Sequence, residues 1–181
     1  MAFETSDWVP FPVELVFAFF ANPSNLPHLM PPEVQARVED VRLQSPPPRP
    51  VPADPARRFR SVAAGVGSEI LMSFYPIKWV PQRMSWTARI VEFAWNSYFI
   101  DEQVRGPFAA FRHRHGIVAQ TRDGIEGTKV TDAIDYSMPG GMWGDFAAGA
   151  VLKQLGRSFE YRQKRLPEIL SVAARQAVRR A

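Results

Sequence analysis

The sequence predicts an α+β fold in which a curved antiparallel sheet of about six to seven strands wraps around a long C-terminal helix, with two short helices after the first strand. Five strand-like runs follow Gly67 and are separated by turn signals at short intervals, which is typical of an antiparallel meander. From about Asp145, apolar residues recur at helical spacing almost to the C-terminus. A sheet that curls around such a helix leaves a gap, so this architecture predicts a ligand cavity.

The N-terminal part predicts one strand, two short helical segments and a second strand. Residues 2–9 alternate between apolar and polar side chains, and Pro12 suits the first turn of a helix. Asn22-Pro23 ends that helix, because the residue before proline avoids the helical region. Residues 24–32 predict a short helical turn or loop, and residues 33–44 alternate as a strand.

Residues 45–55, SPPPRPVPADP, contain six prolines and predict an extended, polyproline-like loop. Such a segment is either a surface loop or a ligand for the aromatic groove of a partner protein. Within the long helix, Pro167 predicts a kink, because it removes one backbone hydrogen bond. The basic tail at residues 172–181 could fray.

Composition limits the class of protein. The chain has 181 residues, 46% of them hydrophobic, and predicts a single domain over residues 1–181. It lacks cysteine, which excludes disulfides, thiolate metal sites and cysteine nucleophiles. Neither a signal peptide nor an apolar membrane span is apparent, so we expect a cytoplasmic protein, monomeric or homodimeric, without integral membrane association. The net charge is +4, and much of the basic excess lies in the predicted C-terminal helix, where it predicts a solvated basic face. We expect no nucleic-acid partner.

Two stretches, FIDEQVRGPFAAFRHRHGI and GTKVTDAIDYSMPGG, resemble the START-like (SRPBCC) superfamily, and within it a bacterial branch of polyketide cyclase/dehydrase type. The positions that fit are Asp101, Gln103, Gly106, Pro107, Phe108, His113, His115, Gly127, Thr128, Asp132 and Tyr136. Phe111 stands where the pattern has tryptophan. The resemblance spans nearly the whole chain and implies the helix-grip fold, whereas members of this branch largely lack an established activity.

The two closely spaced histidines are expected to point into the concave side of the sheet. Alternation places Phe111, His113, His115 and Ile117 on one face of a strand and Arg112 and Arg114 on the other. The same logic turns Asp132 and Tyr136 inward on the next strand, where Asp132 can approach a histidine. For Asp101 and Gln103 the hairpin register, and therefore the face, stays open.

Three functions compete for these residues. A metal site would need a third ligand, which Asp132 could supply, but histidines two apart on a strand are widely spaced, and we predict neither metal nor cofactor. An enzyme of cyclase or dehydratase type would use His113 or His115 as its general acid or base, and Asp132, the third candidate catalytic residue, would orient the imidazole. The leading hypothesis is the binding of a small hydrophobic or amphipathic molecule in the cavity. Its predicted ligand-binding residues are Gln103, Phe111, His113, His115, Asp132, Tyr136 and Trp86.

Overall fold

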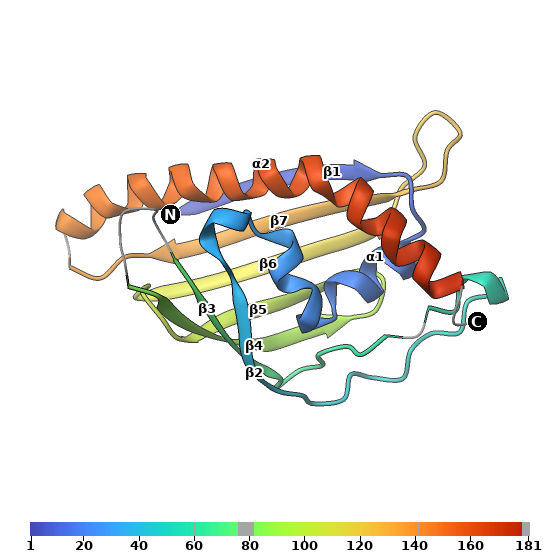
Figure 1. The fold of residues 1–181 in the computed structure, drawn as a ribbon, viewed down its shortest axis with the longest axis horizontal. Coiled ribbons are helices and arrows are strands. Elements are labelled where there is room, and N and C mark those ends of the chain that lie inside the picture. The colour runs from blue at the N-terminus through green and yellow to red at the C-terminus, as the bar shows by residue number, and fades with distance from the viewer. Residues whose placement is uncertain (60, 76–81, 141, 179–181) are drawn as a thin grey trace.

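The structure, a computed structural model, describes residues 1–59, 61–75, 82–140 and 142–178, and the side chains of residues 142–148 and 177–178 are not described. Its central feature is an antiparallel sheet in the order β1-β7-β6-β5-β4-β3-β2 (Figure 1). The strands are β1 (Ala2–Val9), β2 (Arg37–Arg42), β3 (Glu69–Phe74), β4 (Met84–Ala94), β5 (Tyr98–Arg105), β6 (Ala110–Ala119) and β7 (Thr128–Ser137). The predicted curved sheet of six to seven strands is therefore confirmed.

One long helix, α2 (Met142–Val178), lies along the sheet and bends toward α1 in its C-terminal part (Figure 1). Pro167 lies inside this helix and lacks the N–H that would complete the ladder. The predicted basic tail is helical as far as Val178, and residues 179–181 lie outside the described residues. None of the helices in the described part of the chain combines the length and the hydropathy that a membrane span needs.

The two predicted short helices follow β1 as α1 (Val13–Phe20) and the 3-10 helix η1 (Pro23–Leu29). Pro12 caps α1 in an extended conformation, and the side chain of Asn22 accepts a hydrogen bond from the Ser24 N–H at the start of η1. Two further 3-10 turns are η2 (Pro32–Val34) and η3 (Pro55–Arg57). Nearly every residue of α1 is buried, so this helix closes one end of the interior.

The proline-rich loop is anchored to its own chain. The indole N–H of Trp95 donates to the carbonyl of Pro47 at 2.7 Å, and the guanidinium of Arg49 stacks over the Trp95 ring at 4.4 Å. This packing of a proline-rich segment on an aromatic ring favours the interpretation as a surface loop of this protein over a ligand for a partner.

The hydrophobic interior consists of two clusters, and both contribute to the space between the sheet and the helices. The α1 half is built on the buried side chains Val9, Val13, Val16, Phe17, Phe19, Phe20, Leu29, Ile70, Met72, Ile90, Phe99, Ile117, Val130, Leu166 and Leu170. The aromatic half is built on Phe111, Ile134, Tyr136 and Phe159, with Phe3, Trp86, Phe108, Met138, Val151 and Leu155 half-buried against them. A row of charged side chains lies between these two halves.

Candidate functional site

Four titratable side chains of the sheet come together because of strand register. Residue His113 on β6 lies opposite Asp101 on β5, and His115 on β6 lies opposite Asp132 on β7. Since alternate residues share a face, all four side chains point to the concave side, where all four are buried. The inward orientation predicted for His113, His115 and Asp132 agrees with this geometry, and the open question of Asp101 is answered.

The alternate residues of β6 point to the opposite face, as the sequence predicted. Arg112 forms ion pairs with Glu92, at 2.6 Å, and with Glu102. The guanidinium of Arg114 is exposed and lies over the ring of Tyr98 at 4.1 Å. These arginines therefore stabilise the convex surface and have no part in the interior site.

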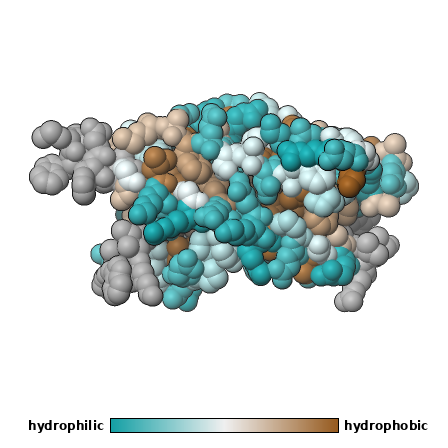
Figure 2. Space-filling view, turned by 90° about the horizontal axis from the view of Figure 1, so that it is seen from above, coloured by the Kyte–Doolittle hydropathy of each residue, from teal (hydrophilic) through white to brown (hydrophobic). Residues whose placement is uncertain are grey.

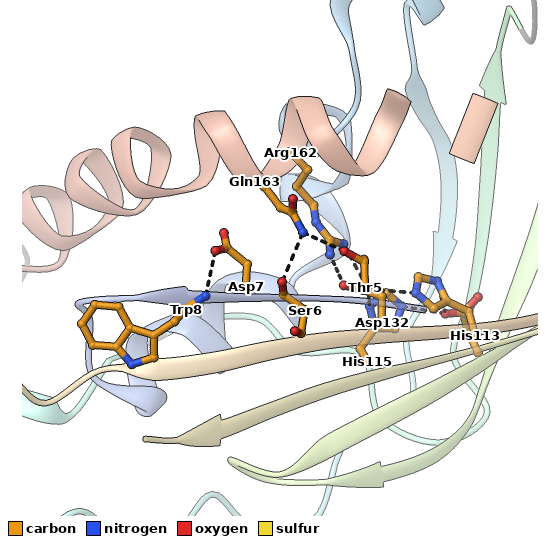
Figure 3. A network of polar contacts seen from close by, with 10 residues as sticks. Thr5, Ser6, Asp7, Trp8, His113, His115, Asp132, Arg162 and Gln163 are labelled. Carbon is orange, nitrogen blue, oxygen red and sulfur yellow. Dashed lines mark hydrogen bonds and ion pairs between the residues drawn. The ribbon is translucent and has the colours of Figure 1, made fainter. Parts of the chain in front are cut away.

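Arg162 completes the charged group from above, on α2. Its guanidinium donates to both oxygens of Asp132, with 3.1 Å between Nη1 and Oδ1, and its exposed fraction is 7% (Figure 3). The neighbouring Gln163 donates to the hydroxyl of Thr5 at 2.7 Å, which fixes the rotation of α2 over β1. We call Asp101, His113, His115, Asp132 and Arg162 the ionic cluster.

Arg162 was not predicted as a site residue, because the sequence placed it on the solvated basic face of the helix. The missed signal was spacing: Arg162 follows Phe159 by three residues and precedes Leu166 by four, so it shares their apolar stripe. An arginine within such a stripe must find a buried partner, because an uncompensated buried charge is costly.

Hydrogen bonds and close approaches link the histidines to both carboxylates. The Nε2–H of His113 donates to Asp132 Oδ1 at 2.9 Å, and the Nε2–H of His115 donates to Asp101 Oδ2 at 3.0 Å. His115 Nδ1 lies 3.3 Å from Asp132 Oδ1 but has no aligned hydrogen-bond partner among the described residues. The two imidazole rings face one another with their centroids 3.7 Å apart.

This arrangement shifts the proton affinities of the two histidines in opposite directions. Burial, together with the nearby His115, lowers the pKa of His113. Burial also opposes protonation of His115, but the hydrogen bond to Asp101 and the charges of both carboxylates outweigh it and raise the pKa of His115. A proton held by the pair therefore resides on His115. With that proton, the formal charges of the ionic cluster cancel.

Asp132 is the most deeply buried member, and burial by itself would favour its neutral form. The positive charge of Arg162, the hydrogen bond from His113 and the close approach of His115 outweigh burial and hold the pKa of Asp132 well below its ordinary value. Asp132 thus remains a carboxylate that orients both imidazoles.

The aromatic half adjoins the ionic cluster at His113, whose ring packs edge-on against Phe111 and Phe159. Trp86 on β4 packs edge-on against Phe111, with ring centroids 4.6 Å apart, and also contacts Phe108. The indole Nε1 of Trp86 is buried and has no hydrogen-bond partner among the described residues. An unpaired buried donor is costly, which makes this nitrogen a candidate contact for a bound acceptor.

Two other predicted ligand-binding residues take different places. Tyr136 is buried in the aromatic half, and burial raises the pKa of its phenol. Gln103 instead holds the turn between β5 and β6: its amide donates to the Phe108 carbonyl at 2.8 Å and accepts from the Phe108 N–H at 3.2 Å. A Cβ at Gly106 would lie 2.3 Å from the Gln103 amide oxygen, so this clamp requires glycine there.

Two hollows on the described part of the structure lie outside the aromatic half. One of about 190 Å³ is lined by the proline-rich loop, Arg57 and Trp95, and one of about 440 Å³ lies along β1 and β7, where Glu4 and Asp132 contribute to its lining. From above, hydrophobic surface gathers toward the left-hand end of the molecule, while hydrophilic side chains cover its middle (Figure 2). Leu152 of α2 is 44% exposed, so apolar surface of the helix reaches solvent.

The family described as polyketide cyclase / dehydrase and lipid transport matches residues 9–161. No curated protein matches the sequence significantly. Three solved structures share the fold: TTHA0849 from Thermus thermophilus (16% identity, TM-score 0.60, covering 96% of this chain and 99% of that one), the Zhui aromatase/cyclase from Streptomyces sp. R1128 (16%, 0.58, 98% and 95%) and Ara h 8.0201 (12%, 0.52, 91% and 95%). At these identities the similarity shows the fold alone.

Proposed function

This chain belongs to the polyketide cyclase/dehydrase and lipid-transport family, and from that premise we propose that it binds a small hydrophobic or amphipathic molecule in the aromatic half of its interior. The ligand would contact Trp86 and Phe111 on the sheet and Phe108 in the turn between β5 and β6, with α2 above it. The ionic cluster forms the polar end of this site.

The observation that carries this proposal is the indole N–H of Trp86, which lies among aromatic rings and has no partner in the described part of the chain. Stable cores satisfy their buried donors, and the other described indole nitrogens do so: Trp8 donates to Gln120 and Trp95 donates to Pro47. A ligand that places an oxygen near Trp86 Nε1 would satisfy this donor while covering the apolar rings. This favours an amphipathic molecule over a pure hydrocarbon.

The polar end of the site supports the same choice of ligand. The edge-on contacts of the His113 ring with Phe111 and Phe159 mark the point where aromatic surface meets charged groups. A molecule with an apolar body and one polar group matches such a boundary, because each part meets a surface of its own kind.

What favours binding over the alternative, a cyclase- or dehydratase-type enzyme, is that one nitrogen of each histidine is already paired with a carboxylate of the chain. Both Nε2 atoms of the histidines donate to carboxylates of the same chain, and Asp132 is further held by Arg162. A general base must instead reach a proton of its substrate. These hydrogen bonds hold the side chains of the ionic cluster in place, which suits a binding site.

The proposal is tested with the fluorescent amphiphile 1-anilinonaphthalene-8-sulfonate and with medium-chain fatty acids that compete for its site. Trp86→Phe keeps the ring contacts but removes the N–H, and we expect it to weaken fatty-acid binding about 5- to 10-fold, the loss of one hydrogen bond. Trp95→Phe is the matched control, because its indole already bonds Pro47, and should bind as the wild type does. A wild-type protein that binds neither probe, or equal losses in both variants, would contradict the proposal.

A further inference from the structure

We propose that Asp101, His113 and His115 form a binding site for one first-row divalent metal ion, with Asp132 and Arg162 supporting the ligands from behind. This inference does not depend on the proposed hydrophobic ligand. The sequence pattern predicted no metal because histidines two apart on a strand are widely spaced. In the structure their ring centroids lie only 3.7 Å apart, and strand β5 adds a further ligand in Asp101.

The three ligand atoms already form a compact triangle. Asp101 Oδ2 lies 3.0 Å from His115 Nε2 and 3.9 Å from His113 Nδ1, and the ligand atoms of the three residues all lie within 4.8 Å of one another. In a tetrahedral zinc site with bonds of about 2.0 to 2.1 Å, neighbouring ligand atoms are about 3.3 Å apart. Small side-chain rotations would therefore suffice to bring all three onto one ion.

The second nitrogen of each imidazole faces the same carboxylate. The His113 Nε2–H donates to Asp132 Oδ1 at 2.9 Å, and His115 Nδ1 lies 3.3 Å from that same oxygen. Metal-binding histidines usually donate their other N–H to a carboxylate, which fixes the tautomer and the ring orientation. Asp132 is placed to do this for both rings, and Arg162 holds Asp132 in position.

His115 Nδ1 adds an independent observation, because it is buried without an aligned hydrogen bond among the described residues. If His115 binds a metal through Nε2, its proton must reside on Nδ1. A small rotation of the ring then directs that N–H at Asp132. The ion would thus complete a polar group that the protein alone leaves incomplete.

Exposure of the side chains shows where an ion can approach. The side chains of His113, His115 and Asp101 retain exposed fractions of 11%, 11% and 13%, whereas Asp132 retains 1%. The ligand triangle is therefore the more open side of the ionic cluster, and the supporting carboxylate is its closed side. Two imidazoles and one carboxylate favour Zn²⁺, Co²⁺ or Ni²⁺ over Mg²⁺ and Ca²⁺, which prefer oxygen ligands.

The test is titration of the EDTA-treated, dialysed full chain with Zn²⁺ by calorimetry and with Co²⁺ by visible absorption. We expect one ion per chain and absorption bands of Co²⁺ in a low-symmetry nitrogen and oxygen site. Asp101→Asn should weaken the affinity about 10-fold or more. Asp132→Asn should weaken it about 10- to 100-fold, as loss of a supporting carboxylate does.

The matched control is His28→Ala, which removes the exposed third histidine and should leave the affinity unchanged. Where a variant fails to fold by circular dichroism, imidazole ¹H–¹⁵N spectra of the wild type with Zn²⁺ give the answer. His113 Nδ1 and His115 Nε2 should shift and His28 should not. Absence of binding, an affinity lost with His28→Ala, or an affinity unchanged in folded Asp101→Asn would overturn the proposal.

Discussion

The α1 half and the aromatic half of the interior lie between the same sheet and the same helix, yet their side chains are buried to different degrees. In the α1 half, Phe17, Leu166 and Leu170 are fully buried. In the aromatic half, Trp86 and Phe108 stay half-buried, and one indole donor lacks a partner among the described residues. The α1 half therefore has the larger set of buried side chains, and the aromatic half is the one with a buried donor left to satisfy. The ionic cluster is the boundary between them.

The largest loss of stability is expected from a substitution in the ionic cluster. Arg162→Met removes the charge that compensates Asp132 and should lower the free energy of unfolding by about 3 to 5 kcal/mol, measured by urea denaturation. Arg165→Met is the control on the same helix, because Arg165 is exposed and its ion pair with Glu168 should contribute about 1 kcal/mol or less. Equal effects of the two substitutions would mean that the ionic cluster does not behave as a buried unit.

The next largest loss of stability is expected when a leucine side chain is truncated, and this substitution can be made in both halves. Leu166→Ala creates a cavity in the closed half and should cost about 2 to 5 kcal/mol of unfolding free energy. Leu155→Ala, in the half-buried half, should cost about 1 kcal/mol, since less surface is buried there. A larger loss for Leu155→Ala in urea denaturation would reverse the comparison.

A smaller loss of stability is expected at Gln103, which lies at the rim of the aromatic half. Gln103→Ala removes both hydrogen bonds to Phe108 and should cost about 1 to 2 kcal/mol by thermal or urea unfolding. Fatty-acid affinity of the folded variant should change little. The opposite outcome, normal stability with much weaker ligand binding, would make Gln103 a ligand contact, as its position in the sequence pattern predicted.

The smallest effect is expected for Trp86→Phe, which should change the unfolding free energy by less than about 1 kcal/mol, because the N–H that it removes makes no hydrogen bond to any described residue. Trp95→Phe, by contrast, loses the hydrogen bond to Pro47. Unfolding monitored by circular dichroism compares the two variants. A strongly destabilised Trp86→Phe would argue that Trp86 belongs to the folding core.

Strand alternation made the concave orientation of His113, His115 and Asp132 predictable, because one apolar residue on each side fixes the face of a whole strand. Asp101 was not assignable, since a hairpin slip of one residue reverses its face, and the observed register is set by the Gln103 clamp and Gly106. Arg162 was missed because a basic residue on a long helix is usually solvated. Only its place between Phe159 and Leu166, and a partner 30 residues away, reveal its burial.

The proposed function requires that a ligand occupies the aromatic half and contacts Trp86. The most direct measurement is the ¹H–¹⁵N spectrum of the indole groups of the five tryptophans during titration with a medium-chain fatty acid. The Trp86 resonance, assigned with Trp86→Phe, should shift in a saturable manner, while those of Trp8 and Trp95 remain in place. A shift confined to Trp95, beside the surface hollow, or no shift at any indole, would contradict the account.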